Sequence, residues 1–284
     1  MHSLALPRLY YRLVKFEHTV FALPFAYVGA LLAVHAVPSA HDLFWITIAM
    51  IGARSLAMAL NRLIDARIDA ANPRTAGREL PTGALSVSAV LSFCISALAV
   101  YLIAVWQLDP FVRPLAPIPV AMFVVYPYLK RFTWLCHLWL GVVDGLAPVG
   151  AWAAVRGELP WQAWALGGAV AAWVAGFDLF YALFDVEIDR AQRLHSWATR
   201  FGETGAFWGA RALHLATVGL LCVAGLGLAA GVPYWLGVIV VGCLLTYEHL
   251  LVRPGDLRRL DTAFFTMNGV ISIAFFAFVL ADVL

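Results

Sequence analysis

"DLFWITIAMIGARSLAMALNRLIDARIDAANPRTAGREL", residues 42–80, joins two halves of opposite character. The first half is apolar, with Asp42 and Arg54 as its only charged residues up to Leu60. The second half gathers Asp65, Asp69 and several arginines within a short stretch. Because the apolar half approaches the roughly 20 residues that a bilayer-spanning helix needs, the stretch predicts a membrane helix that ends in a densely charged segment.

Apolar runs of this kind recur along the chain. Hydrophobic residues make up 63% of the 284 positions and the mean hydropathy is +0.84. Charged residues make up 13%, against about 25% in an ordinary soluble domain. We therefore predict an all-α, polytopic membrane protein that forms a single domain over 1–284, with nine transmembrane helices around a central cavity. The predicted spans are 16–37, 42–64, 85–106, 111–129, 135–155, 161–184, 207–230, 232–251 and 262–284.

The positive charges sort to one side of this arrangement. With nine spans, the outer connections hold only Arg113 and Arg156, and Arg54 lies within a span. The other lysines and arginines, sixteen of the 19, fall on the opposite side. By the positive-inside rule, the N-terminus and the charged segments face the cytoplasm, which favours an integral protein of a bacterial cytoplasmic membrane. The four cysteines lie in or beside apolar spans without paired spacing, so no disulfide framework or zinc site is expected.

Two of the segments predicted to lie on the cytoplasmic side share the same order of acidic and basic residues. The first carries Asn61, Asp65 and Asp69 before its arginines, and the second carries Asp185 and Asp189 before its own. Residues four apart share a helix face, and like charges at this spacing repel each other. Two such pairs indicate that a cation lies between the carboxylates. The alternative is ordinary salt bridging with neighbouring arginines, such as Arg62 or Arg67 with Asp65.

The candidate ligands are all oxygens, with Asn61 and Asp178 near the four aspartates, and oxygen ligands favour Mg²⁺ or Ca²⁺ over zinc or copper. Mg²⁺ typically uses one or two carboxylates and completes its shell with water and phosphates. The surrounding arginines suit a metal-bound diphosphate. A water-soluble nucleotide would not require nine membrane spans, whereas a diphosphate attached to a long hydrocarbon would. The sequence thus predicts a polyprenyl diphosphate as a ligand.

Three elements carry a resemblance to the UbiA family of membrane prenyltransferases. "NRLIDARIDAANPRTAGRELPTG", 61–83, resembles the family's first signature, N-x-x-x-D-x-x-x-D with trailing arginines. "DLFYALFDVEIDRAQRLHSWATRFG", 178–202, resembles the second, D-x-x-Y-x-x-x-D-x-x-x-D. "YPYLK", 126–130, resembles a Y-x-x-x-K element between them. The order of the elements and the nine-span count agree with the family, so the resemblance covers essentially the whole chain.

The resemblance implies Mg²⁺-dependent transfer of a polyprenyl group from its diphosphate to an aromatic ring. It implies that Asp65, Asp69, Asp185 and Asp189 are catalytic as metal ligands, with Asn61 assisting. The implied substrate-binding residues are Asn61, Arg74, Arg78, Tyr126, Lys130, Lys15, Asp178 and Tyr181. For Lys15 the alternative is a lysine whose head reaches the membrane surface beside span one.

Arg54 is expected to face the same cavity, because it lies seven residues before Asn61 on one predicted helix. An arginine inside the membrane marks a functional site by default, and its guanidinium suits the carboxylate of an aromatic acid. The bland alternative is a buried ion pair with Asp144 or Asp178. The acceptor stays open between 4-hydroxybenzoate, for ubiquinone synthesis, and a dihydroxynaphthoate, for menaquinone synthesis. "KFEHTVFALPFA" and "YALFDVEIDRAQRLHS" resemble a futalosine-type menaquinone branch of the family, which implies 1,4-dihydroxy-6-naphthoate.

Two other classes compete with this interpretation. A cation-coupled transporter would also place acidic residues near paired repeats, and Arg54, Asp144, Asp178 and Glu248 do lie within predicted spans. The main acidic pairs, however, lie at the inner surface among arginines, which suits an anion bridged by metal. A CDP-alcohol-type head-group transferase uses clustered aspartates too, but its compact signature is absent from this sequence.

Overall fold

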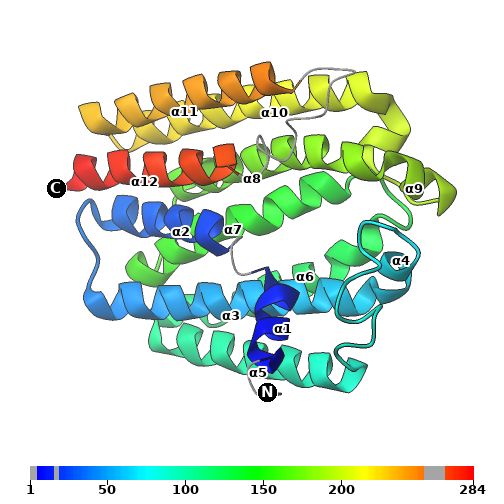
Figure 1. Cartoon of the computed structure of the whole chain (residues 1–284). Coiled ribbons are helices and arrows are strands. Elements are labelled where there is room, and N and C mark those ends of the chain that lie inside the picture. Colours follow the sequence, from blue (N-terminus) through cyan, green and yellow to red (C-terminus); the bar gives the residue numbers. More distant parts are fainter. Residues whose placement is uncertain (1–4, 16–18, 253–265) are drawn as a thin grey trace.

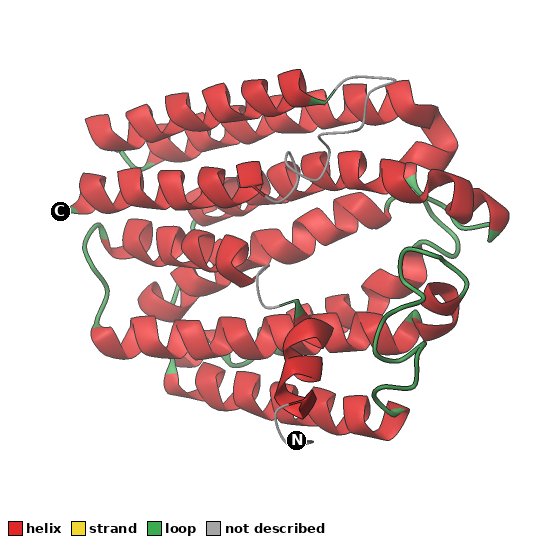
Figure 2. Ribbon diagram, viewed as in Figure 1, coloured by secondary structure: helices red, strands yellow, loops and turns green. Residues whose placement is uncertain are grey.

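The computed structural model of the chain describes residues 5–15, 19–252 and 266–284. Throughout these ranges the regular structure is helical, without a β-strand (Figure 2). The elements are α1 (Ala5–Val14), α2 (Thr19–Val34), α3 (Ala40–Ile64), α4 (Ala66–Ala70), α5 (Val87–Gln107), η2 (Pro110–Val112), α6 (Pro117–Leu129), α7 (Cys136–Arg156), α8 (Trp161–Tyr181), η3 (Ala182–Asp185), α9 (Val186–Ala191), α10 (Trp197–Gly227), α11 (Val232–Leu251) and α12 (Asn268–Val283). The predicted all-α class is confirmed for the part of the chain that these ranges cover.

The long helices run alongside one another as a single bundle (Figure 1). In this view α10 and α11 form one side, α3 and α5 form the opposite side, and α2, α7, α8 and α12 lie between them. The strongest packing pairs α8 with α10, α7 with α8, α3 with α5, and α2 with α7. Helices suit a bilayer because they satisfy every backbone hydrogen bond internally.

Seven segments are long and apolar enough to cross a membrane. They are Ala40–Ile64, Val87–Gln107, Pro110–Leu129, Cys136–Arg156, Trp161–Ala191, Trp197–Gly227 and Val232–Leu251. They correspond to the second to eighth predicted spans. The helices at the first and ninth positions, α2 and α12, are apolar but have 16 residues each, and the predicted spans there begin at residues outside the described ranges. The count of nine and the cytoplasmic N-terminus therefore stay predictions.

Two predicted boundaries differ from the structure near the second acidic segment. The span predicted at 207–230 begins at Trp197, because Ser196 forms a capping box with Thr199. Gly202, at φ 71°, permits a kink inside the resulting long helix. The span predicted at 161–184 leaves α-geometry after Tyr181 and continues as η3 and α9. The predicted inner loop is thus largely helical.

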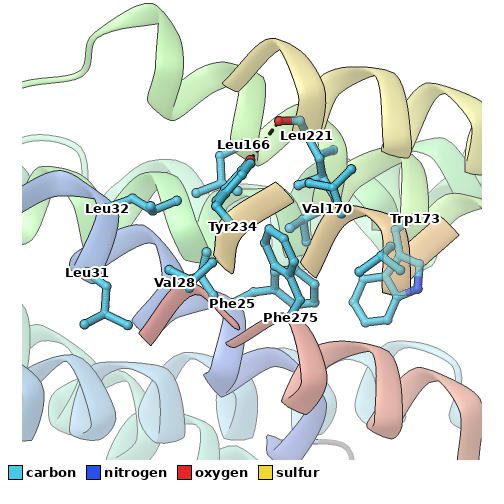
Figure 3. Packing of buried hydrophobic residues seen from close by; sticks show 14 of the residues in the cluster. Phe25, Val28, Leu31, Leu32, Leu166, Val170, Trp173, Leu221, Tyr234 and Phe275 are labelled. Carbon is cyan, nitrogen blue, oxygen red and sulfur yellow. Dashed lines mark hydrogen bonds between the residues drawn. The ribbon is translucent and has the colours of Figure 1, made fainter. Parts of the chain in front are cut away.

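One apolar core holds the C-terminal helices against α2. It is built on large side chains from six helices, among them Phe25 of α2, Trp173 of α8, Tyr234 of α11 and Phe275 of α12 (Figure 3). The Tyr234 hydroxyl donates a hydrogen bond to the carbonyl oxygen of Leu221 at 2.7 Å, so its polar atom is satisfied inside this core. The core fixes α8, which carries the second acidic segment at its end.

A line of small residues brings α7 and α8 into backbone contact. A Cβ added at Gly141 would lie 2.2 Å from the carbonyl oxygen of Ala171, and one at Gly145 would lie 2.4 Å from that of Gly167. Small residues allow membrane helices this close approach, and van der Waals packing then holds them together. The α7 and α8 helices are therefore closely packed against each other.

We expect Gly141→Ala to destabilise the protein although alanine is the better helix former by about 1 kcal/mol. The added methyl meets backbone rather than a movable side chain, and such overpacking typically costs about 1–3 kcal/mol. The melting temperature in detergent should fall. Gly219→Ala is the matched control, since a Cβ there meets nothing within 4 Å. An equal response in both variants would contradict the close contact.

Candidate active site

The acidic and basic segments meet at one end of the bundle. Asp65, at the junction of α3 and α4, is only 2% exposed. The Nζ atom of Lys130, just after α6, lies 2.6 Å from its Oδ2, and the guanidinium of Arg131 lies 3.3 Å from its Oδ1. Burial raises the pKa of Asp65 above its ordinary value, and the charge of Lys130 opposes that shift. A buried carboxylate is thus held between two cations.

The first acidic segment also contacts the second directly. The Nε atom of Arg74 donates to Asp185 Oδ1 at 3.0 Å, and the Asn72 side-chain amide donates to the same oxygen at 3.0 Å. Another nitrogen of Arg74 donates to the Tyr181 hydroxyl at 2.8 Å. Burial, the largest single effect, lowers the pKa of Arg74, but the hydrogen bonds and charges of Asp185 and Tyr181 together outweigh it, so the net pKa shift is upward. Arg78 completes the set, with one nitrogen 2.7 Å from both oxygens of Asp69.

The backbone joins the third motif to these two. The amide nitrogen of His195 donates to the carbonyl oxygen of Lys130 at 2.6 Å. The segment after α9 and the segment after α6 are therefore linked at the residue that pairs with Asp65. The three elements that the sequence singled out lie together.

The helical geometry of the first motif differs from the prediction of one continuous helix face. The α3 helix ends at Ile64, and Asp65 has φ −93° and ψ 5°, outside the α-helical range. The amide nitrogen of Asp69 still donates to the carbonyl oxygen of Asp65 at 2.8 Å. The two carboxylates stay about one turn apart, but they now follow a bend and pair with different cations.

A cavity of about 640 Å³ extends from this charged end into the bundle. Lys15, Asn61, Arg62, Arg78 and Tyr181 line its charged end. Further along, its walls are almost entirely apolar and include Met50, Val105, Leu108, Val112, Ala147 and Leu159. Its volume lies in the usual range for ligand pockets, about 300–1,000 Å³. The chamber can hold a molecule with an anionic head and an apolar body.

One ion pair stands in the apolar part of the wall. Arg54 of α3 contacts Asp144 of α7 at 3.0 Å, and both side chains line the cavity. The Nε atom of Arg54 is buried and makes no hydrogen bond. The ion pair of Arg54 with Asp144 that the sequence offered as the structural alternative is therefore present.

The predicted site residues separate into three groups. Asp65 with Lys130, Asp69 with Arg78, and Asp185 with Arg74 form ion pairs. The residues Lys15, Arg54, Asn61, Tyr126, Asp178 and Tyr181 line the cavity. Asp189 lies in α9, outside the cavity lining, where its backbone carbonyl accepts from the amide of Leu194 at 2.8 Å. Of the aromatic residues beside the second motif, Phe177 and Tyr181 line the cavity, whereas Phe180 is buried in another cluster.

Sequence reasoning did not single out four residues that take part. Arg131 pairs with Asp65, and Asn72 bonds Asp185. Arg62 is 4% exposed and lines the cavity. His137 bonds Asp178. Adjacency to Lys130 and to the first motif could have indicated Arg131 and Asn72, but a histidine inside an apolar span gives no periodic signal.

The donor set fits Mg²⁺ bound together with phosphate. In the ranges that the structure describes, the carboxylate, histidine and cysteine side chains form no group of three or more around a common metal position. Asp65, Asp69 and Asp185 instead each pair with a cation, and Arg74 and Asn72 of the first segment bond Asp185 of the second. Mg²⁺ characteristically takes one or two carboxylates and leaves its other positions to water and phosphate oxygens. The same cations suit the oxygens of a diphosphate.

An apolar chamber within a bundle of membrane-length helices, with cations and carboxylates gathered at one end, suits a membrane-embedded enzyme for a molecule with an anionic head and an apolar body. The comparisons with known proteins give this class a family. The sequence profile of the UbiA prenyltransferase family matches residues 22–276. The chain belongs to this family, and it is therefore a prenyltransferase.

Named relatives and solved structures support this family assignment. The chain is 30% identical over 270 residues to the 4-hydroxybenzoate octaprenyltransferase of Vibrio cholerae, covering 93% of each chain. The apo structure of a UbiA homologue from Aeropyrum pernix K1 superposes with a TM-score of 0.85 at 31% identity, over 94% of this chain and 98% of that one. A UbiA homologue from Archaeoglobus fulgidus, solved bound to GPP and Mg²⁺, shares the fold with a TM-score of 0.79 at 20% identity, over 97% and 99%. The resemblance predicted from the motifs is confirmed, and the transporter and the CDP-alcohol-type transferase find no support among these relatives.

The buried ion pairs can be tested without substrate. Arg78→Leu leaves the Asp69 carboxylate without its cation, which costs about 3–5 kcal/mol in a fully buried pair. Since Arg78 is partly exposed, we expect a loss of about 2 kcal/mol, measured as a lower melting temperature in detergent without divalent ions. The double variant Arg78→Leu/Asp69→Asn should regain part of it, because the unpaired charge of Asp69 is then removed.

The control is Arg156→Leu, which breaks the exposed pair with Glu158. Exposed pairs contribute about 0–1 kcal/mol. A loss at Arg156 as large as that at Arg78, or no recovery in the double variant, would contradict a buried Arg78–Asp69 interaction.

Proposed function

We propose that the protein transfers a polyprenyl group from polyprenyl diphosphate to a ring carbon of an aromatic acid, with Mg²⁺, in respiratory quinone synthesis. The observation that carries this proposal is the chamber with a charged end built by both acidic motifs and a single arginine in its apolar wall. The relatives named 4-hydroxybenzoate octaprenyltransferase and the homologue solved with GPP and Mg²⁺ support it.

The proposed metal ligands are Asp65, Asp69, Asp185 and Asp189, with Asn61 assisting. When bound, Mg²⁺ would neutralise the diphosphate and stabilise the charge that develops on it as a leaving group. The charged end faces the cytoplasm in this proposal, in line with the distribution of basic residues.

Lys130, Arg74 and Arg78 would bind the diphosphate oxygens, with Lys15 at the cavity entrance. The carboxylates hold these cations at the charged end before substrate arrives, and the cations exchange partners when metal and diphosphate bind, so they are in place as the allylic C–O bond breaks. The leaving diphosphate takes the electron pair of that bond. The ring faces of Phe177 and Tyr181, which line the cavity, can stabilise the positive charge left on the prenyl carbon.

The apolar walls serve the same reaction by excluding water. An allylic cation in an open site would be quenched by water, so enclosure favours attack by the aromatic ring. The prenyl chain would lie along the apolar chamber, with Tyr126 and Asp178 near the reacting carbon. The acceptor ring, held close to that carbon, would then attack through one of its own carbons.

Arg54 would hold the carboxylate of the acceptor. It lies about 10 Å along α3 from Asn61, at 1.5 Å rise per residue, which places a second substrate beside the prenyl carbon rather than on the diphosphate. We propose 4-hydroxybenzoate or 1,4-dihydroxy-6-naphthoate as the acceptor. Product analysis with geranyl diphosphate, Mg²⁺ and each acid separately distinguishes the two.

Asp65→Asn and Asp185→Asn keep side-chain size but remove a charged ligand. We expect turnover to fall by about 100-fold or more, the usual effect of losing one preorganised charge-stabilising group, while the protein still folds. EDTA should abolish product formation, and added Mg²⁺ should restore it. Glu158→Gln, an exposed carboxylate outside the cavity, is the control. Full turnover in EDTA would exclude the metal from the reaction.

Arg54→Leu and Asp144→Asn together test the acceptor site. Losing a charge-assisted hydrogen bond costs about 1.5–3 kcal/mol, so Arg54→Leu should raise KM for the aromatic acid about 10- to 100-fold. Asp144→Asn removes the competing carboxylate and should leave that KM unchanged or lower it. If both variants only lose thermal stability and keep a normal acceptor KM, the Arg54–Asp144 pair is structural.

A further inference from the structure

A second polar pair, with little exposure to solvent, joins α7 and α8 nearer the charged end of the cavity. The Nδ1 atom of His137, in α7, lies 2.7 Å from Oδ2 of Asp178, in α8. His137 is 8% exposed. Asp178 lines the cavity, as does Tyr126.

The position of this pair follows from the packing of α7 on α8. Residues 137, 141 and 145 lie four apart, so His137 continues the line of Gly141 and Gly145 that contacts α8. Because those glycines already bring the two backbones into contact, the helices do not need a polar pair to associate. The close approach instead holds the imidazole against Asp178 at the cavity wall.

The pair also has a defined place relative to Arg54. Arg54 of α3 and Asp144 of α7 pair in the cavity wall, at 3.0 Å. His137 lies seven residues before Asp144 on α7, about 10 Å nearer the charged end. Asn61 lies at the equivalent displacement from Arg54 on α3. An aromatic ring held by its carboxylate at Arg54 therefore extends toward Asp178 and toward the prenyl carbon.

Ring prenylation releases one proton, and the groups described so far do not take it. The new C–C bond uses a π electron pair of the ring, and the C–O bond pair leaves with the diphosphate. The hydrogen on the attacked ring carbon must then depart as a proton, returning its bonding pair to the ring. A base beside that carbon accelerates this step.

We propose that Asp178 accepts the ring proton and that His137 is a positioning residue that holds the Asp178 carboxylate toward the acceptor. This inference rests on the proposed aromatic prenyl transfer. The proton ends on the Asp178 carboxylate, and the imidazole, hydrogen-bonded through Nδ1, fixes the orientation of that group. The imidazole need not touch either substrate.

The test uses full-length protein in detergent with Mg²⁺, geranyl diphosphate and each acceptor, unlabelled or deuterated at the ring carbons next to its hydroxyl. His137→Leu removes the hydrogen bond at similar volume. His137→Asn is the conservative variant, because its amide nitrogen can occupy the position of Nδ1. Asp178→Asn removes the base itself.

With His137→Leu we expect kcat to fall at least tenfold and a primary deuterium isotope effect to appear that the unaltered protein lacks, because proton removal becomes rate-limiting. KM for geranyl diphosphate should not change. His137→Asn should restore most of kcat and abolish the isotope effect, and Asp178→Asn should behave like His137→Leu or worse.

Lower turnover without an isotope effect, parallel losses in His137→Leu and His137→Asn, or a normal rate in Asp178→Asn would each overturn the inference. If His137→Leu does not fold, Asp178→Asn, which keeps the shape of the side chain, still decides through its own isotope effect. The unaltered protein is assayed before any variant. If it prenylates none of the acceptors, the proposed function is contradicted rather than this inference.

Discussion

The need to neutralise charge at the end of an apolar bundle governs the arrangement of this protein. A carboxylate as buried as Asp65 is stable only beside cations, and Lys130 and Arg131 reach it from the end of a different helix. Arg74 and Arg78 do the same for Asp185 and Asp69. Since each pair joins segments that are distant in sequence or separated by a bend, charge neutralisation also closes the end of the bundle and sets the shape of the cavity below it.

The sequence was informative wherever a rule acts locally. Apolar length predicted seven segments that the structure shows as long and helical. The charged motifs predicted that acidic and basic segments gather at one end, but not that Asp65 pairs with Lys130 and Arg131. Prediction was weaker where the backbone geometry depends on contacts with residues that are distant in the sequence. The bend at Asp65 arises because its carboxylate turns toward Lys130, more than sixty positions away. The α10 helix begins about ten residues before the predicted span because Ser196 caps it, within a segment that was predicted to be a loop.

His137 illustrates a different limit. Its role depends on the contact between α7 and α8, and glycine spacing alone does not reveal which neighbour a helix face will meet. Arg54 was predicted to be functional because an arginine inside a membrane is energetically unfavourable. The structure shows that Asp144 pairs with it. A functional arginine and a structural counter-ion are therefore compatible at one position, because the guanidinium has more donors than a single carboxylate can accept.

The ion pairs at the charged end have a thermodynamic consequence for binding order. A metal that binds Asp69 or Asp185 must displace Arg78 or Arg74, and a diphosphate that takes those arginines must release the aspartates. Each ligand thereby removes the competitor of the other, and such linkage is reciprocal. Either ligand alone encounters a site that is already neutralised, so the two are expected to bind with positive cooperativity. Free inorganic anions and free divalent ions would then compete poorly with a prenyl diphosphate that arrives together with its metal.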